Sequence, residues 1–304
     1  MSLLFILGNG FDRAHNLKTS YSHFKKWLLA NRRLDVIAEL QSLFPARQDD
    51  EFLLWSQFEK ALTQYDKNAV EGWALDSLYV AIEESGGREI FTSGDVLDTS
   101  IIDIVNNAFS AWVNDIEVSG MRIFDFDNSA KFITFNYTET LERLYSIPAN
   151  RILHIHGKAH SDSGIIVGHR TVIDPLSGSF DNNDFRGNNN SVQNLADLAD
   201  MYKPSEEIIR QNSAFFNSLS DVDNVIVIGH SCSDVDELYF KATAANVRPG
   251  ITWKFTYFNE QKDLANIETL IDAIPLDRNH VSIELTREYI GRQCGVVNGS
   301  SQKQ

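Results

Sequence analysis

Cysteine is scarce in this chain of 304 residues, which contains only Cys232 and Cys294. The two thiols do not form a Cys-x-x-Cys pair, so they supply neither a disulfide framework nor a thiolate zinc site. So little cysteine is typical of a reducing, intracellular compartment. Long hydrophobic runs are absent too, since none approaches the ~20 residues that a membrane-spanning helix needs. The apolar run at residues 3–7 is too short for a signal-peptide core and has no basic residue before it, so we expect a cytoplasmic protein.

Positive charge is also in short supply. The chain has 27 lysines and arginines against 42 aspartates and glutamates, which gives a formal charge of -15 and a sequence pI near 4.9. Nucleic acids and anionic membranes bind through clustered positive charge, so neither is an expected partner. An anionic small molecule would need a local pocket. The remaining composition, 43% hydrophobic and 23% charged, is that of an ordinary soluble protein.

The later two thirds of the chain alternate apolar strand-like segments with helix-like segments. Strands are expected at residues 3–7, 131–136, 151–156, 164–167, 225–228, 253–258 and 281–285. Helices are expected between the later strands, at residues 138–145, 204–219, 234–245 and 263–273. Continuously apolar strands separated by helices are typical of a parallel sheet with helices on both faces. The sequence therefore predicts an α/β fold, a Rossmann-like three-layer parallel sheet.

A long helix-like stretch separates the first strand from the second. Its segments are residues 21–30, 33–43, 52–65, 70–84 and 96–116. We interpret residues 20–125 approximately as a large helical insertion within a single domain of residues 1–290. The polar, Asn- and Gly-rich segment 177–191 has no periodicity and is a candidate mobile loop or lid. Residues 291–304 are expected to form a flexible tail.

Four polar turns follow predicted strands, and ligands bind parallel sheets beyond the carboxyl ends of the strands. We therefore expect these turns to converge in space although they are distant in sequence. They are Gly8-Asn9-Gly10-Phe11-Asp12, Asn136-Tyr137-Thr138, His156-Gly157 and Gly229-His230-Ser231.

The first turn has two glycines that let the backbone bend tightly and approach a ligand. Successive N–H groups in such a turn can bind phosphate, although a plain strand-to-helix turn has the same residues. Arg13 stands where the dinucleotide fingerprint has its third glycine, which disfavours a standard dehydrogenase. If the turn binds phosphate, Gly10→Val is expected to weaken nucleotide binding while the fold survives.

Two histidines lie two residues apart near the end of a predicted strand. His154 and His156 would point to the same face of a regular strand, where they permit a metal site with His169 or Asp162. They also permit a simpler arrangement in which His156 is a general base and His154 is structural.

The other polar positions have equally open interpretations. Asn136 can orient a ribose hydroxyl or a water, or bond its own loop. Asp234 and Asp236 can cap the helix that follows Ser231, whose amino terminus can face phosphate. Asn259 can bond a ribose or lie in a solvated turn.

Four segments together resemble a known family. The sequences are LFILGNGFDRAHNLKTSYSHF, FNYTETLERLY, ILHIHGK and VIVIGHSCSDVDELYF. In this order and spacing they strongly resemble the AbiH family of bacterial phage abortive-infection proteins, from about Leu3 to Phe240. A weaker similarity is to sirtuin-like NAD-binding domains, which carry a glycine turn, an Asn-containing turn, a His-Gly and a later Gly-x-Ser turn.

The sirtuin-like similarity implies particular roles. Asn136 and His156 match the catalytic Asn and His. The nucleotide-binding residues that it and the turns indicate are Gly8, Asn9, Gly10, Phe11, Asp12, Gly229, His230, Ser231, Asp234 and Asn259. The sequence departs from that pattern at Asp12, where those domains usually have Ser, and at Thr138, where they usually have Asp. It also lacks a four-cysteine zinc site.

The leading hypothesis is an anti-phage defence protein that binds NAD, as ligand or substrate, and hydrolyses the nicotinamide–ribose bond without a metal. A first alternative is a metal-dependent hydrolase or nuclease that uses the His154–His156 pair. A second is a non-catalytic sensor that binds a nucleotide and contacts a phage-derived trigger or host protein through the helical insertion. A homo-oligomer is compatible with each.

Overall fold

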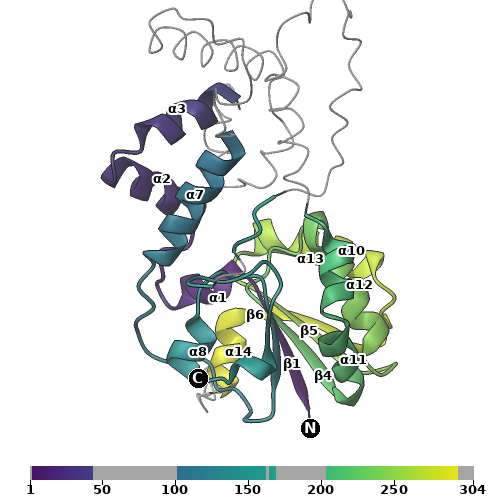
Figure 1. Cartoon of the computed structure of the whole chain (residues 1–304). Coiled ribbons are helices and arrows are strands. Elements are labelled where there is room, and N and C mark those ends of the chain that lie inside the picture. Colours follow the sequence, from purple (N-terminus) through teal and green to yellow (C-terminus); the bar gives the residue numbers. More distant parts are fainter. Residues whose placement is uncertain (1, 44–100, 162–163, 169–202, 294–304) are drawn as a thin grey trace, which may run out of the picture. The chain divides into compact units, whose positions relative to one another are not determined.

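The computed structural model describes residues 2–43, 101–161, 164–168 and 203–293. Its centre is a six-stranded sheet in which every pairing is parallel (Figure 1). The strands are β1 (Leu3–Leu7), β2 (Lys131–Thr134), β3 (Ile152–His154), β4 (Asn224–Ile228), β5 (Thr252–Tyr257) and β6 (Val281–Leu285). The predicted Rossmann-like α/β fold is therefore confirmed.

The strand order is β3-β2-β1-β4-β5-β6. The chain thus proceeds outward in one direction from β1 to β3, then returns to the other side of β1 and proceeds through β4 to β6. In open sheets of this kind the crevice beside the reversal, at the carboxyl ends of the strands, is where ligands bind. The reversal lies between β1 and β4, whose residues pair from Leu3 with Asn224 to Leu7 with Ile228.

Helices cover both faces of the sheet. In Figure 1, α8 and α14 lie on one face, and α10, α11 and α12 lie on the other. The helices that pack with the sheet are α1 (Asn9–Ala14), α8 (Thr140–Tyr145), α10 (Ser205–Gln211), α11 (Ser213–Asn217), α12 (Glu237–Asn246), α13 (Glu260–Ala273) and α14 (Thr286–Gln293). Short 3-10 turns are η1 (Ala149–Arg151), η2 (Ser218–Asp221), η3 (Asp234–Asp236) and η4 (Arg278–His280).

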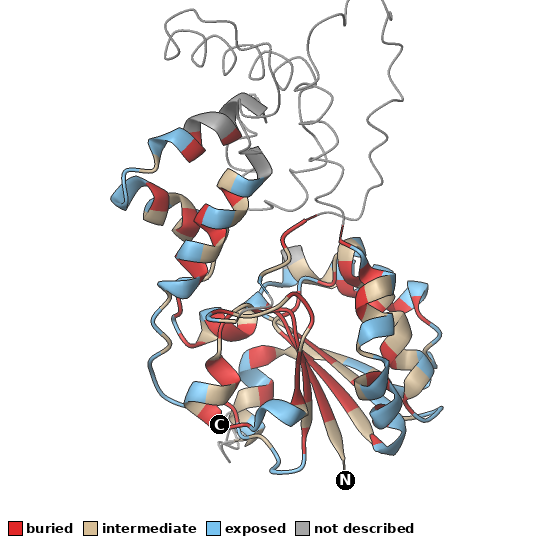
Figure 2. Cartoon of the chain, in the orientation of Figure 1, coloured by how far each residue is buried: buried red, intermediate tan, exposed pale blue. Residues whose placement is uncertain are grey.

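The core surrounds the central strands, which Figure 2 shows as almost wholly buried. Residues 4–7 of β1 and residues 225–228 of β4 are buried on both faces, as their continuous apolar sequences predict. On the α8 face, aromatic side chains fill the space between the sheet and the helices. They include Phe5, Phe11, Phe124, Phe132, Tyr145 and Tyr289.

A buried hydrogen-bond junction ties α1 to α8 inside this core. His15 Nδ1 donates to the Phe11 carbonyl at 2.8 Å, which leaves Nε2 to accept a hydrogen bond from the Tyr145 hydroxyl at 2.6 Å. The same hydroxyl oxygen accepts from the backbone N–H groups of Ile123 and Phe124. One phenol therefore satisfies three polar groups that the core would otherwise leave unpaired.

Tyr145→Phe is expected to lower the free energy of unfolding by about 2 kcal/mol, because buried donors and acceptors that lose their partner retain their desolvation cost. The ring and its packing are preserved, so the loss isolates the hydroxyl. Denaturant titration of the two proteins measures the difference. An unchanged transition midpoint would mean that the three groups find other partners.

The described chain divides into two compact units. The first comes from residues 1–19, 116–165 and 204–304 and holds the sheet, and the second comes from residues 20–115 and 166–203. The second unit contains α2 (Tyr21–Ala30), α3 (Leu34–Leu43) and α7 (Ile101–Asn114). Phe24 of α2 packs on Phe109 and Trp112 of α7, which buries the apolar stripes that predicted these helices.

The sequence-based boundaries differ from the structure in several places. Residues 164–167 make only an isolated antiparallel bridge between Gly157 and Ile165 rather than a strand. The helix expected over residues 204–219 is broken at Asn212 into α10 and α11, and residues 218–221 form η2. The structure also contains two helices that the sequence patterns do not predict, α1 and α14. The helices expected at residues 52–65 and 70–84, the loop 177–191 and His169 lie outside the described residues.

Within the part of the chain that the structure describes, no helix is both long and apolar enough to cross a membrane.

Candidate functional site

Two glycine turns meet at the reversal of the sheet. The turn after β1 and the turn after β4 join through backbone hydrogen bonds, from Gly8 N to Ile228 O at 3.0 Å and from Gly10 N to Gly229 O at 2.8 Å. Gly229 has φ +63, a conformation that favours glycine. A Cβ on Gly10 would lie 2.7 Å from Gly229 Cα, and one on Gly8 would lie 2.5 Å from His230 Cα. The turns thus touch through their backbones.

This contact gives the glycines a structural role that the sequence interpretation did not include. The Gly8 N–H donates to the carbonyl of Ile228 at the end of β4, the Gly10 N–H donates to the carbonyl of Gly229, and Phe11 N donates to Gly8 O. These three donors are therefore already engaged by protein. Phosphate binding at this turn stays a prediction, and it would use other donors.

Gly10→Val is consequently expected to lower the free energy of unfolding by about 1–3 kcal/mol, as overpacking does elsewhere, because the added carbons meet backbone that cannot withdraw. The fold is still expected to survive this change, but the geometry adds a cost in stability to the expected loss of nucleotide binding. Thermal or denaturant unfolding tests it. A variant as stable as the wild type would show that the two turns separate easily.

Asp12 is a carboxyl group buried beneath the first turn. It is 1% exposed, and its two oxygens accept hydrogen bonds from Thr138 Oγ1 at 2.5 Å and Thr140 Oγ1 at 2.8 Å. Burial raises the pKa of Asp12 from 3.8 to about 6, against the opposing effects of the two hydroxyls, the His154 ring and the Asn136 amide. At neutral pH the group is mainly ionised, which makes it a negative charge held inside the protein.

Asn136 lies directly after β2 and is 6% exposed. Its backbone N–H donates to Thr134 Oγ1, and its carbonyl accepts from His154 Nδ1 at 3.2 Å. The side-chain Nδ2 is buried without a hydrogen-bond partner of good geometry among the described residues. Buried donors in native proteins are nearly always bonded, and this amide lies close enough to the Asp12 carboxyl to lower its pKa without making a hydrogen bond of good geometry.

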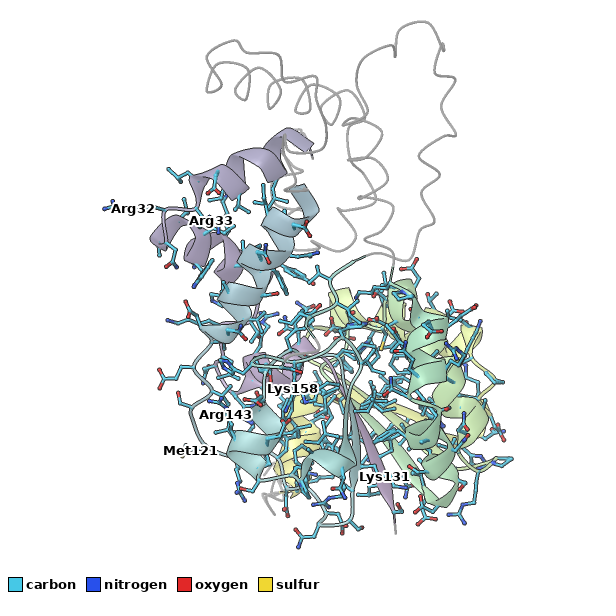
Figure 3. All side chains as sticks on the ribbon, viewed as in Figure 1. Arg32, Arg33, Met121, Lys131, Arg143 and Lys158 are labelled. Atoms are coloured by element: carbon cyan, nitrogen blue, oxygen red, sulfur yellow. The ribbon has the colours of Figure 1, made fainter. Side chains whose placement is uncertain are left out.

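A charged network fixes the strand end that carries His154. His154 Nε2 lies 3.1 Å from Glu142 Oε1, and Lys158 Nζ lies 3.1 Å from Glu139 and 3.2 Å from Glu142. Arg143, labelled with Lys158 in Figure 3, pairs with Glu139 at 2.8 Å. Nearby charges keep the pKa of Glu142 low although burial opposes this. The His154 ring is thus held between α8 and the Asn136 backbone, which is a structural position.

His156 points elsewhere. The strand ends at His154, so His156 belongs to the following turn and the two rings do not share a face. His156 is 3% exposed, and its Nε2 lies 3.8 Å from Asp236 Oδ1. The other Asp236 oxygen lies 3.5 Å from His230 Nε2. The structure therefore brings together His156 and His230 around a carboxylate that the sequence interpretation had assigned to helix capping.

The capping interpretation of Asp236 is wrong. Asp236 occupies the position before α12 but makes no side-chain capping hydrogen bond there. Its neighbourhood is aromatic instead. Phe135 packs against both imidazoles, with ring centroids 5.5 Å from His156 and 4.3 Å from His230, and Tyr239 packs against His156.

The remaining predicted binding residues have varied positions. Phe11 is in the hydrophobic core, so its side chain does not face the edge of the sheet. Asn9 is exposed and exchanges hydrogen bonds with Thr19. Ser231, Asp234 and Asn259 are exposed. Asn259 N donates to Asp263 at 3.0 Å, as in a helix-starting turn.

The geometry bears directly on the metal-dependent alternative. Among the described residues no group of three or more His, Cys, Asp or Glu side chains could hold a metal ion. His230 cannot act as a ligand through Nε2, because the Cys232 N–H donates to its Nδ1 at 2.9 Å and the ring proton must therefore reside on Nε2. Asp162 and His169 lie outside the described residues.

Comparison with protein families decides the membership of the chain. The family model described as "Bacteriophage abortive infection AbiH" matches residues 4–257, which span the sheet from β1 to β5. The chain belongs to the AbiH family. Its membership assigns this AbiH protein a role in abortive infection, a defence against bacteriophage. A comparison with curated proteins finds no match.

The AbiH match includes all four polar turns and the two residues that sequence reasoning missed at the site, Thr140 and Asp236. Thr140 had no distinguishing feature in the sequence. Asp236 did have one, since it lies in the Ser-Asp-Val-Asp segment between a strand and a helix, but capping explains such a residue equally well.

Proposed function

We propose that this AbiH protein acts in phage defence by binding NAD or a related nucleotide at the carboxyl edge of its sheet and hydrolysing the nicotinamide–ribose bond. The observation that carries the proposal is the buried Nδ2 of Asn136, which lies beside the Asp12 carboxyl but makes no hydrogen bond of good geometry among the described residues. A ribose hydroxyl or an attacking water would give this amide an acceptor in good geometry.

The location supports a nucleotide. Asn136 follows β2 and His156 follows β3, while the Gly8 and Gly229 turns flank the reversal between β1 and β4. The residues on either side of Asn136 both lie against His156, with ring centroids at 5.5 Å for Phe135 and 6.4 Å for Tyr137. The amide and the imidazole are thus at one region of the edge where dinucleotides bind in sheets of this order.

The chemistry follows from the residues. Cleavage breaks the bond between ribose C1′ and the pyridinium nitrogen, and nicotinamide leaves with the bonding electron pair. The ribose then has oxocarbenium character, which a nearby negative charge stabilises, as it does in glycoside hydrolysis. Asp12 supplies that charge, Asn136 orients the hydroxyl or the water, and His156 accepts the proton as water adds to C1′.

The departures from the sirtuin-like pattern are consistent with this role. Asp12 stands where that pattern has a hydroxyl, and Thr138 stands where it has a carboxyl. The two side chains hydrogen-bond to each other at 2.5 Å. If the similarity holds, the carboxyl and hydroxyl groups have exchanged positions, and the pair retains its chemistry.

The test is release of nicotinamide and ADP-ribose from NAD by the purified full-length chain, together with cellular NAD levels during phage infection. Nicotinamide release and a fall in NAD on infection are expected. Protection of cells from phage with cellular NAD intact would contradict the hydrolase. Retention of intact NAD through purification and assay, without product, would indicate a nucleotide sensor instead.

A further inference from the structure

Phe258 leaves much of an aromatic ring in solvent. The exposed large hydrophobic residues in the described part of the chain are Leu29, Leu34, Met121 and Phe258, and Phe258, at 45% exposure, is the only aromatic one. Single exposed apolar side chains are common and mean little by themselves. The position of this one gives it meaning, because it directly follows β5 at the carboxyl edge of the sheet, where ligands bind.

The ring extends toward the glycine turns. A Cβ added to Gly10 would lie 2.9 Å from Phe258 Cε2 and 2.7 Å from Gly229 Cα. Gly10 follows β1, Gly229 follows β4 and Phe258 follows β5, and these strands are neighbours in that order. The turns after three strands therefore meet at Gly10. One edge of the Phe258 ring packs against this meeting point, beside the reversal of the sheet.

Hydrogen bonds hold Phe258 in this position. Its own N–H donates to Asp263 Oδ2 at 3.1 Å, and the N–H of Asn259 donates to the same oxygen at 3.0 Å. On the same helix, the Asn266 side chain donates to the Ser231 carbonyl at 3.1 Å, which ties α13 to the turn after β4. A fixed turn thus presents the ring, so a ligand that binds to it does not first have to order the backbone.

An exposed aromatic ring that is held in place can bind flat, uncharged ring systems. Nucleobases stack on Phe, Tyr and Trp side chains, and each stacked base contributes roughly a tenfold to a hundredfold gain in affinity. Stacking requires no positive charge on the protein, which suits a chain with a formal charge of -15. The chemistry of the Phe258 ring therefore favours the base of a nucleotide over its phosphates.

The strand order indicates which base this would be. In the proposed mechanism the nicotinamide ribose lies at Asn136 and His156, which follow β2 and β3 on one side of β1. Phe258 follows β5, on the other side of β1. A dinucleotide with its nicotinamide end at β2 and its phosphates beside the reversal directs its adenine toward β5. The exposed ring thus lies at the part of the edge where the adenine would be.

We propose that Phe258 is a binding residue on which the adenine ring of an adenine dinucleotide stacks. The proposal rests on the proposed function for the orientation of the dinucleotide, because Asn136 and His156 assign the nicotinamide end. Stacking itself needs no turnover. Binding of ADP-ribose to the purified full-length chain therefore tests the role of Phe258 separately from NAD cleavage.

Phe258→Leu is the main test, because leucine keeps an apolar side chain but has no ring on which a base can stack. Calorimetry is expected to show that this change lowers the affinity for ADP-ribose roughly tenfold or more. Nicotinamide mononucleotide, which has no adenine, is expected to bind to Phe258→Leu and to the wild type equally. Phe258→Tyr, which keeps the ring, is expected to retain the affinity for ADP-ribose. Met121→Ala, which removes another exposed large hydrophobic side chain, is the matched control.

Undiminished ADP-ribose affinity in Phe258→Leu would overturn the inference. An equal loss of affinity for nicotinamide mononucleotide would also overturn it, because the ring would then act through the glycine turn. NAD cleavage by Phe258→Leu with the KM of the wild type would overturn the inference and leave the proposed function intact. ADP-ribose binding that depends on the ring, without NAD cleavage, would support the stacking and refute the hydrolase. A wild type that binds neither ADP-ribose nor NAD would refute both.

Discussion

His156→Gln and Asn136→Ala are each expected to reduce NAD turnover by roughly two orders of magnitude or more, the usual cost of removing a general base or its positioning partner. Glutamine at position 156 fills most of the imidazole volume, which limits the cavity in this buried position. Nucleotide affinity is expected to persist in both variants, since the turns after β1 and β4 are unchanged. Nicotinamide release and calorimetric binding measure the two effects separately.

The two changes together are expected to cost little more than either alone, because groups that act on one step are not additive. His280→Gln, an exposed histidine in η4, is the matched control. Undiminished NAD cleavage in both folded variants would remove Asn136 and His156 from the active site. Losses that multiply in the double variant would show that the residues act in separate steps.

Asp12→Asn is expected to stabilise the protein by about 3 kcal/mol above pH 6. Burial raises the pKa of Asp12 from 3.8 to about 6. Between about pH 4 and pH 6, the folded protein therefore still has a proton on Asp12 that the unfolded chain has released. The free energy of unfolding thus falls as the pH rises through this range. Above pH 6 the full cost of burying the ionised carboxyl group is present. A pKa difference of about 2 units, at about 1.36 kcal/mol for each unit, gives about 3 kcal/mol.

The surrounding hydroxyls can accommodate an amide in place of the carboxylate. Thr138 and Thr140 both donate to Asp12, although their own oxygens lie only 2.9 Å apart. In the Asp12→Asn variant, the amide NH2 can donate to the hydroxyl of one threonine. That hydroxyl can donate to the other threonine, whose own proton goes to the amide oxygen. Both threonine hydroxyls then keep a partner, so the gain from removing a buried charge is not lost again.

Denaturant unfolding at pH 4 and pH 7.5 measures the effect. The free energies of unfolding of the variant and the wild type are expected to differ little at pH 4 and by about 3 kcal/mol at pH 7.5. Asp272→Asn, which removes the same charge from an exposed side chain on α13, is the control and is expected to match the wild type at both pH values. NAD turnover is expected to fall by an order of magnitude or more as stability rises, because the stabilising charge is gone. A less stable variant at pH 7.5 would show that the ionised carboxyl contributes to folding rather than to function.

The sheet could be predicted from the sequence because its strands are short, continuously apolar and separated by amphipathic helices. Residues 225–228 admit hardly any other interpretation. α14 escaped because its sequence, Thr-Arg-Glu-Tyr-Ile-Gly-Arg-Gln, buries only Thr286 and Tyr289. A helix with so narrow a buried face has little periodic apolar pattern.

The edge residues could be predicted as a group but not in their pairings. Position after a strand indicates that Asp12, Asn136 and His156 lie at one edge. The sequence does not indicate at which residue each strand ends. Because β3 ends at His154, His156 lies in the following turn and does not share a face with His154. The contact of Asp12 with Thr138 joins residues 126 positions apart. Such a pairing depends on the strand order, which periodicity does not determine.

The contact between the turns after β1 and β4 has a consequence for evolution. Gly8, Gly10 and Gly229 approach one another through main-chain atoms, with less than 3 Å available to an added carbon. A larger side chain at one of these positions cannot be compensated by a smaller one opposite, because glycine is already the smallest residue. Related proteins can exchange surface residues freely as they diverge, but the positions where these two turns touch admit almost no residue except glycine. The three glycines therefore provide fixed reference points for aligning relatives that share little else.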